Sequence, residues 1–249
     1  MIKVSSIFLA ADHSTLLSYW RSSAVRRRRL LHFDSHGDLR GAILDRSGKL
    51  LGWFPWEDSV DQGNFLLHAA REDLVERVRW VHDELGGREL DMGTLLFADE
   101  LSTGLRRLMA PWMVPATTRT DLHYEIIPYK HFGGIESDEE LDIDWDFFAA
   151  EGRSPKDLDR MVEEFFGTHI TALPQTTYLV ASPDYSPPWS RQRFEQVVER
   201  LETLMTCEAT ILEPPWENRT PSFLSALRRG VRKWILPVKR LVFPTRVDS

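Results

Sequence analysis

Apolar runs and amphipathic segments alternate along most of this chain. Short apolar runs bounded by charged or turn-forming residues predict strands, and apolar residues three and four apart predict helices. The predicted strands lie within residues 3–11, 26–33, 139–152 and 176–189, and the predicted helices span residues 14–25, 64–85, 154–169 and 190–206. Residues 41–62 are expected to form a loop, and residues 90–135 to alternate short strands and helices.

This alternation favours an α/β protein with three layers, in which a mostly parallel sheet is covered by helices on both faces. The chain has 249 residues, of which 42% are hydrophobic, so it is long enough to bury one large core. We therefore expect a single α/β domain over residues 1–227, followed by a basic C-terminal arm over residues 228–249.

Charge and cysteine content narrow the classes of partner and compartment. The net charge of −7 gives no overall attraction to nucleic acid, which is not expected as a partner. Cys207 is the only cysteine, which excludes an internal disulfide and suits a reducing compartment. The apolar run near the N-terminus is too short for a signal peptide or a membrane span. The chain is thus expected to be cytoplasmic without stable membrane association, and a homo-oligomer is left open.

Three acidic and histidine-containing clusters follow predicted strands. They are Asp12-His13-Ser14, then Asp34-Ser35-His36-Gly37-Asp38, then Asp142-Ile143-Asp144-Trp145-Asp146. In a strand, side chains two apart leave on the same face, so each of the last two clusters is expected to present its polar groups together. Because active sites of parallel sheets lie beyond the carboxyl ends of the strands, the three clusters are expected to converge.

The donor set indicates a metal site with two ions. Two imidazoles and four carboxylates are too many ligands for one zinc ion, and suit a pair of manganese ions that share carboxylates. Such a pair can hold a bridging hydroxide, so hydrolysis is the expected reaction. A solvated edge strand or an acidic strand end is the alternative for the third cluster alone. The candidate ligands are His13, Asp34, His36, Asp38, Asp144 and Asp146.

The order of these clusters resembles the ureohydrolase superfamily of arginases and agmatinases. The matching stretches are "AADHS", "DSHGD" and "LDIDWD", at residues 10–14, 34–38 and 141–146. The resemblance implies an arginase-like fold and two Mn²⁺ ions, with Asp34 and Asp144 as bridges. It implies that His13 and Asp38 bind one ion and that His36 and Asp146 bind the other. Asp38 then also orients the hydroxide, and Asp142 stands where the family has Ser.

The substrate-binding elements of arginases are only partly matched. The family's Gly-Asn-x-His segment is echoed by Gly63-Asn64, and the nearest histidine, His68, comes two residues late. By position, Ser182 and Asp184 are candidates for the substrate wall, although Asp184 is also typical of a turn. A histidine at the position of His68 on a helix is more often a half-buried structural residue than a catalytic one. The candidate catalytic residues are Asp38, His68 and Asp146, and the candidate substrate-binding residues are Asn64, Ser182 and Asp184.

These departures are most similar to the peptide arginases of ribosomal peptide pathways. That resemblance implies a hydrolase that converts arginine side chains of a precursor peptide to ornithine and releases urea. Two alternatives stay open at this point. One is a hydrolase of a small guanidino or amide compound, similar to agmatinases or deacetylases. The other is a protein that binds metal without catalysis.

Overall fold

A computed structural model describes residues 5–55, 59–83, 96–97, 110–117, 120–150, 152–169 and 174–216. The strands are β1 Ser6–Ala10, β2 Arg28–Phe33, β3 Ala42–Leu44, β4 Leu50–Trp53, β5 Val75–His82, β6 Leu96–Phe97, β7 Val114–Pro115, β8 His123–Pro128, β9 Glu140–Asp144, β10 Thr176–Val180 and β11 Ala209–Ile211. The helices are α1 His13–Ser22, α2 Phe65–Arg71, α4 Trp145–Ala149, α5 Pro155–Glu164 with a π-helical turn at Phe165–His169, and α6 Arg191–Met205.

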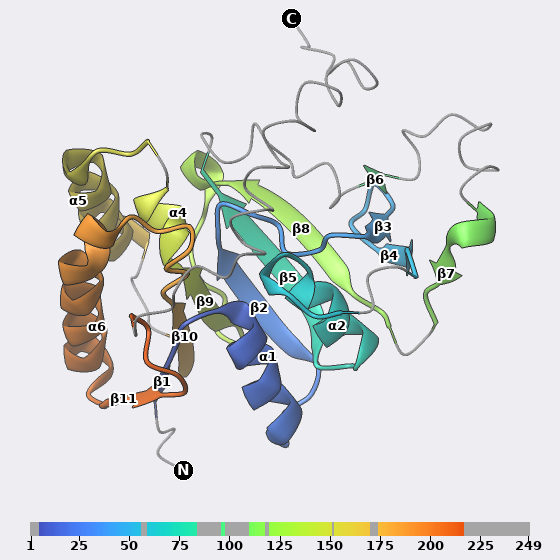
Figure 1. Cartoon of the computed structure of the whole chain (residues 1–249), viewed down its shortest axis with the longest axis horizontal. Helices are drawn as coiled ribbons and strands as arrows, with labels where there is room; N and C mark the ends of the chain where they lie inside the picture. Colours follow the sequence, from blue (N-terminus) through green and yellow to red (C-terminus); the bar gives the residue numbers. More distant parts are fainter. Residues whose placement is uncertain are drawn as a thin grey trace, which may run out of the picture. The chain divides into compact units, whose positions relative to one another are not determined.

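The centre of the fold is a seven-stranded sheet with the order β11-β1-β10-β9-β2-β5-β8 (Figure 1). Every neighbouring pair in this sheet is parallel. β1 and β2 are therefore not neighbours in the sheet, because β10 and β9, which come later in the sequence, lie between them. The α/β class and the parallel sheet predicted from the sequence are therefore confirmed.

Helices cover both faces of the sheet. On one face, Trp20 of α1 lies with its ring centroid 5.5 Å from Tyr178 of β10 and 5.8 Å from Phe65 of α2. On the opposite face, Phe33 at the end of β2 packs edge-on against Phe147 of α4 and against Phe165 beyond α5. Neighbouring residues of a strand leave on opposite faces, so each strand feeds both cores. Figure 1 shows α1 and α2 together and α4, α5 and α6 in a separate group.

The segment 41–62 is not simply the loop that the sequence predicted. β3 and β4 form an antiparallel pair there, and with β6 and β7 they make a second, four-stranded sheet. The short apolar stretches Ala42–Leu44 and Leu50–Trp53 are separated by a turn in which Gly48 adopts a φ of +81°. A Cβ at Gly48 would lie 1.8 Å from the Tyr124 carbonyl oxygen, so only glycine fits there.

The long helix predicted over residues 64–85 is wrong. α2 ends at Arg71, and a turn follows in which Asp73 has a φ of +57°, before β5 begins at Val75. The spacing of apolar residues fits a helix as well as a strand here, and pairing decides between them. β5 is hydrogen-bonded between β2 and β8, which supplies more contacts than an exposed helical extension would.

The chain divides into two units, Met1–Pro215 and Trp216–Ser249. The architecture above belongs to the first unit, and the predicted basic arm over residues 228–249 lies outside the described residues. Among the described helices, none combines the length and the apolar character that crossing a membrane requires.

Replacing Phe33 with Ala should destabilise the fold strongly. Its side chain is fully buried and contacts rings from three other segments, so a cavity would remain after truncation. We expect a loss of about 3–5 kcal/mol in the free energy of unfolding, measured by urea denaturation. The control is Leu204→Ala on α6, where the side chain is 50% exposed. A loss below about 1 kcal/mol for Phe33→Ala would contradict this packing.

Candidate metal centre

The three polar clusters meet at the carboxyl ends of adjacent central strands. β2 pairs with β9, β9 pairs with β10, and β10 pairs with β1. The strand order reverses across this group, which is where parallel sheets leave a crevice for a ligand. The first two clusters follow the ends of β1 and β2, and the third spans the last residues of β9 and the start of α4.

His13 is fixed by the start of helix α1. Asp12 is the N-cap, and its carboxylate accepts a hydrogen bond from the Thr15 amide at 3.1 Å. His13 is therefore the first helical residue, with its side chain buried beneath the end of β1. Its ring stacks on Phe65 of α2 with centroids 4.2 Å apart and planes 8° apart. Helix α2 thus sets the plane of the imidazole.

Asp34, His36 and Asp38 project from a loop rather than from the strand that the sequence predicted. β2 ends at Phe33, and Asp38 adopts a left-handed backbone with a φ of +50°. The indole Nε1 of Trp80 donates to the Asp34 carbonyl at 2.9 Å, and the Tyr124 hydroxyl donates to the Gly37 carbonyl at 2.7 Å. These bonds and the left-handed residue bend the loop. The three side chains are therefore brought together by the loop conformation and not by the alternation of side chains along a strand.

Asp144 and Asp146 meet through a helix start. Asp144 ends β9 and caps α4, where its carboxylate accepts from the Asp146 amide at 3.1 Å. Asp146 lies in the first turn of α4, so the alternation predicted along a continuous strand stops at Asp144. Beside them, the Ser182 hydroxyl donates to Oδ2 of Asp144 at 2.7 Å. Ser182 itself has a φ of +42° directly after β10.

The structure brings all six predicted ligands together in one cluster, within which the ligand atoms form overlapping groups. Nδ1 of His13 lies 3.3 Å from Oδ2 of Asp38 and 3.4 Å from Oδ2 of Asp144. Nδ1 of His36 lies 3.1 Å from Oδ2 of Asp146 and 3.5 Å from Oδ1 of Asp34. One compact set of ligand atoms comes from His13, Asp34 and Asp144, and another from Asp34, His36 and Asp146, so Asp34 belongs to both. Asp38 falls in a third set with His32 and Asp34, and His32 joins His13 and Asp142 in a fourth.

Buried atoms without hydrogen-bond partners show that the donor set fits a cation. Among the described residues, Nδ1 of His13, Oδ2 of Asp34 and Oδ2 of Asp38 are buried and accept or donate no hydrogen bond. Polar atoms left so in a protein interior are costly unless something binds them. Carboxylate oxygens and imidazole nitrogens are common ligands of divalent metal ions. The residues present could therefore hold a metal ion.

Two residues at the centre, His32 and Asp142, are not among the six ligands that the sequence predicted. His32 of β2 is fully buried, and its Nδ1 is hydrogen-bonded to Oδ2 of Asp142 at 2.8 Å. Its other ring nitrogen, Nε2, lies 3.3 Å from Oδ2 of Asp34. The same oxygen of Asp142 lies 3.3 Å from Nε2 of His13. His32 lies in β2, two residues before Asp34. That spacing could have identified His32 as a candidate, although its partner Asp142 lies 110 residues away.

Burial and mutual charge shift the pKa values of this cluster in both directions. Burial alone would lower the pKa of His32, but the carboxylates of Asp142 and Asp34 outweigh it and raise that pKa to about 9. The pKa of His36 is raised by Asp146 and Asp34, again against burial. Burial and the charge of Asp34 raise the pKa of Asp38 well above its usual range. Without cations, the cluster therefore holds protons.

The predicted substrate residues Asn64 and Asp184 and the predicted catalytic residue His68 lie outside the close groups of ligand atoms found among the described residues. Oδ1 of Asn64 accepts from the Asp61 amide at 2.8 Å, and its Nδ2 donates to the Ser59 carbonyl at 2.9 Å, so the side chain holds the turn before α2. His68 is buried on α2, outside the close groups of ligand atoms found among the described residues. Asp184 is exposed in the turn after β10. Of the three, none is brought into the group of six ligands.

One aromatic residue at the centre was not predicted. The ring of Tyr185, in the turn after β10, lies 5.4 Å from the ring of His36 and is 39% exposed. The side chain of His36 is 30% exposed, whereas those of the other five ligands are almost fully buried. Solvent therefore reaches the ligands on the side of His36 and Tyr185.

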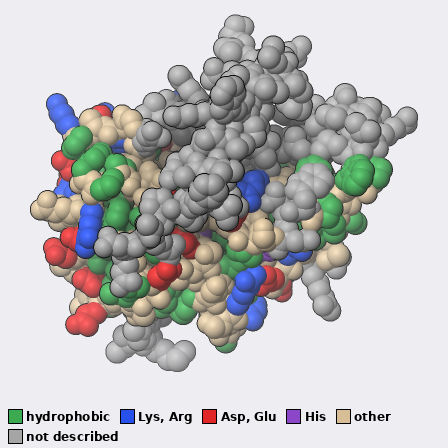
Figure 2. Space-filling model, viewed as in Figure 1, with side chains coloured by type: hydrophobic (Ala, Val, Ile, Leu, Met, Phe, Trp, Pro, Cys, Tyr) green, Lys and Arg blue, Asp and Glu red, His purple; other side chains and the backbone are tan. Residues whose placement is uncertain are grey.

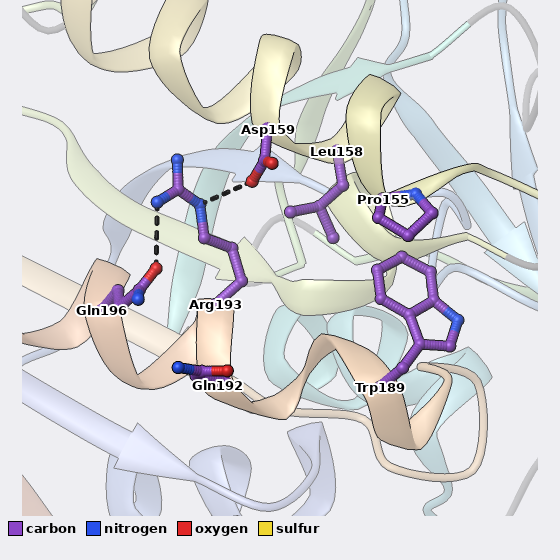
Figure 3. Close-up of a pocket in the computed structure, with 7 residues that line it drawn as sticks. All are labelled: Pro155, Leu158, Asp159, Trp189, Gln192, Arg193 and Gln196. Carbon is purple, nitrogen blue, oxygen red and sulfur yellow. Dashed lines mark hydrogen bonds and ion pairs between the residues drawn. The ribbon is translucent and has the colours of Figure 1, made fainter.

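A separate pocket lies between α5 and the start of α6 (Figure 3). It has a volume of about 200 Å³, and Figure 3 shows the Trp189 indole beside Pro155 and Leu158. Nε of Arg193 lies 3.1 Å from Oδ1 of Asp159 at its rim. Figure 2 shows charged side chains of both signs mixed with hydrophobic ones on this side of the molecule. None of the candidate site residues lines this pocket.

Comparison with family models and with curated proteins finds no match for this chain.

The metal-free protein should lose stability as the pH rises from 6.5 to 9. The folded-state pKa values of His32 and His36 lie above their unfolded values, so the folded chain holds more protons in this window. Their contribution is complete below the unfolded pKa and is lost through the folded pKa, and for His32 it is worth roughly 3 kcal/mol. The raised pKa values of Asp38 and Asp144 act in the same direction.

The measurement is urea denaturation in EDTA at several pH values, repeated with excess Mn²⁺. Because cations displace the protons, we expect Mn²⁺ to stabilise the fold more at pH 9 than at pH 6.5. Stability that rises with pH in EDTA would contradict the direction of these pKa shifts.

Proposed function

We propose that this chain is a metal-dependent C–N hydrolase of guanidino groups, similar to arginases, that uses two Mn²⁺ ions. One observation carries the proposal, namely two groups of ligand atoms that share the carboxylate of Asp34 and are buried except at His36. The motif order, which resembles that of the ureohydrolases, supports the choice of a guanidino substrate. A deacetylase-like reaction at a single ion needs only one such group.

The proposed reaction adds water across a C–N bond of the guanidino group. His13, Asp34, His36, Asp38, Asp144 and Asp146 would hold two divalent ions, which would supply Lewis acidity and lower the pKa of a water molecule toward neutrality. The water oxygen bonds to the guanidinium carbon, the bond from that carbon to the side-chain nitrogen breaks, and the products are urea and an amine. The buried carboxylate of Asp38 holds the water by a hydrogen bond and passes its proton toward the leaving nitrogen.

The substrate is proposed to enter on the side of His36 and Tyr185, where the ligands meet solvent. An aromatic ring beside the entrance can stack on a guanidinium. We propose an arginine side chain within a peptide as the substrate, because the arginase elements that hold a free amino acid are only partly echoed in this chain. His68 is assigned no step. A cytoplasmic location is part of the proposal, since the single Cys207 suits a reducing compartment.

The proposal is tested by incubating the Mn²⁺-loaded protein with an arginine-containing peptide and, separately, with free arginine. Urea release is measured together with the peptide mass. We expect urea from the peptide and a loss of about 42 Da per processed arginine, the mass of CN₂H₂ that converts arginine to ornithine. Urea from free arginine alone would refute the peptide substrate, and urea from neither would refute the guanidino substrate.

Replacing Asp34 with Asn should abolish this activity. The substitution removes the charge of the carboxylate shared by both groups of ligand atoms, so we expect urea release to fall by roughly a thousandfold or more. The control is Asp138→Asn, since Asp138 is an exposed acid paired with Arg29. Activity of Asp34→Asn within tenfold of the parent protein, at saturating Mn²⁺, would rule out Asp34 as a bridge.

Replacing Tyr185 with Ala should weaken substrate binding more than turnover. Loss of a ring that stacks on a guanidinium corresponds to about 0.5–2 kcal/mol, or roughly a 3- to 30-fold increase in KM. Tyr185→Phe should retain the parent KM, and Trp112→Ala, at an exposed tryptophan of the 3₁₀ turn Ala110–Trp112, serves as a control. An unchanged KM for Tyr185→Ala would remove Tyr185 from the entrance.

A further inference from the structure

A pair of buried residues, His32 and Asp142, lies directly beneath the proposed ligands. They face each other across adjacent strands, since His32 of β2 is in register with Asp142 of β9. Both side chains are fully buried. Their contact is the 2.8 Å pair between Nδ1 of His32 and Oδ2 of Asp142. A buried acid and imidazole in this position are far from solvent that could satisfy them.

Each residue of the pair contacts one of the proposed ligands. Oδ2 of Asp142 lies 3.3 Å from Nε2 of His13, on the side of the ring opposite the nitrogen that faces Asp38 and Asp144. Nε2 of His32 lies 3.3 Å from Oδ2 of Asp34 and has no hydrogen-bond partner within the described part of the chain. One carboxylate thus contacts both imidazoles, and one of those imidazoles contacts the shared carboxylate.

We propose that Asp142 and His32 form a positioning pair that selects the metal-facing nitrogen of His13 and holds the bridging carboxylate of Asp34. The inference rests on the proposed two-ion site. A proton on Nε2 of His13, attracted by Asp142, leaves the lone pair on Nδ1 and directs it toward Asp38 and Asp144. Ligand histidines generally need such a partner on the second nitrogen to fix their tautomer and ring orientation.

The surroundings of Asp142 argue against a role in stability alone. Glu140, two residues earlier on the same strand face, is already neutralised by Arg28 at 3.2 Å and by the Tyr178 hydroxyl at 2.7 Å. The carboxylate of Glu140 is therefore paired without any contact to the proposed metal ligands. Asp142 has no arginine or lysine partner among the described contacts, and the side chains beside its Oδ2 are the two imidazoles. Its charge therefore acts on the site.

The test compares Asp142→Asn with Glu140→Gln, a matched loss of one carboxylate charge on the same face of β9. Mn²⁺ is titrated into each full-length metal-free protein, and free Mn²⁺ is followed by electron paramagnetic resonance. We expect Asp142→Asn to bind Mn²⁺ about 10- to 100-fold more weakly. Glu140→Gln should bind Mn²⁺ within twofold of the parent protein, even where its unfolding free energy falls.

A double-mutant cycle isolates the pair. His32→Asn should weaken Mn²⁺ binding like Asp142→Asn, and the double variant should be little weaker than either single variant because the two residues act as a unit. Loss of one whole ion from His32→Asn, with normal binding by Asp142→Asn, would overturn the inference because His32 would then be a ligand itself. Should Asp142→Asn fail to fold, Asp142→Ser replaces it.

The outcomes separate this inference from the proposed function. If the parent protein binds two Mn²⁺ ions and releases urea while Asp142→Asn binds Mn²⁺ as tightly, only the positioning role is wrong. If the parent protein binds no Mn²⁺, the proposed function and the positioning role both fail. Weaker binding by Asp142→Asn, with normal binding by Glu140→Gln, supports the inference.

Discussion

The structure depends on how it accommodates acidic side chains inside a parallel sheet. Glu140, Asp142 and Asp144 follow one another along the same face of β9, and each is buried or mostly buried. Buried carboxylates are costly unless a cation or hydrogen-bond donors accompany them. In this fold the partner changes along the strand. The acid farthest from the site has Arg28, and the next has the imidazoles of His32 and His13.

Asp144, the last acid of the strand, has no arginine or lysine partner among the described contacts. Asp144 receives the Ser182 hydroxyl and the Asp146 amide, but its neighbours Asp34, Asp38 and Asp146 are also acids. Burial, and after it the repulsion between these acids, raises the pKa of Asp144 and of Asp38. Under the proposed function, exchangeable divalent ions would relieve this repulsion, as the guanidinium of Arg28 does for Glu140. The hydrophobic layers of α1, α2 and α4 exclude water around the group and strengthen these interactions.

The sequence allowed the parallel sheet and the ligand clusters to be predicted, because strand ends and polar residues coincide in it. The backbone conformations that bring these candidate ligands together could not be predicted. Asp38 joins the site through a left-handed backbone and Asp146 through a helix start, and neither follows from strand periodicity. The segment 64–85 was assigned to one helix because its apolar spacing also fits a helix, and strand pairing with β2 and β8 decided otherwise. His32 was missed because its partner lies 110 residues away.

The central claim is that these side chains hold two ions, and the most direct measurement is the metal content of the folded chain. The protein is loaded with Mn²⁺ and freed of excess metal, and its metal is then counted by elemental analysis and examined by electron paramagnetic resonance. We predict about two Mn²⁺ per chain with a spectrum of magnetically coupled ions, which lie roughly 3.5–4 Å apart in such sites. A single ion per chain, or one zinc that manganese cannot replace, would contradict the account.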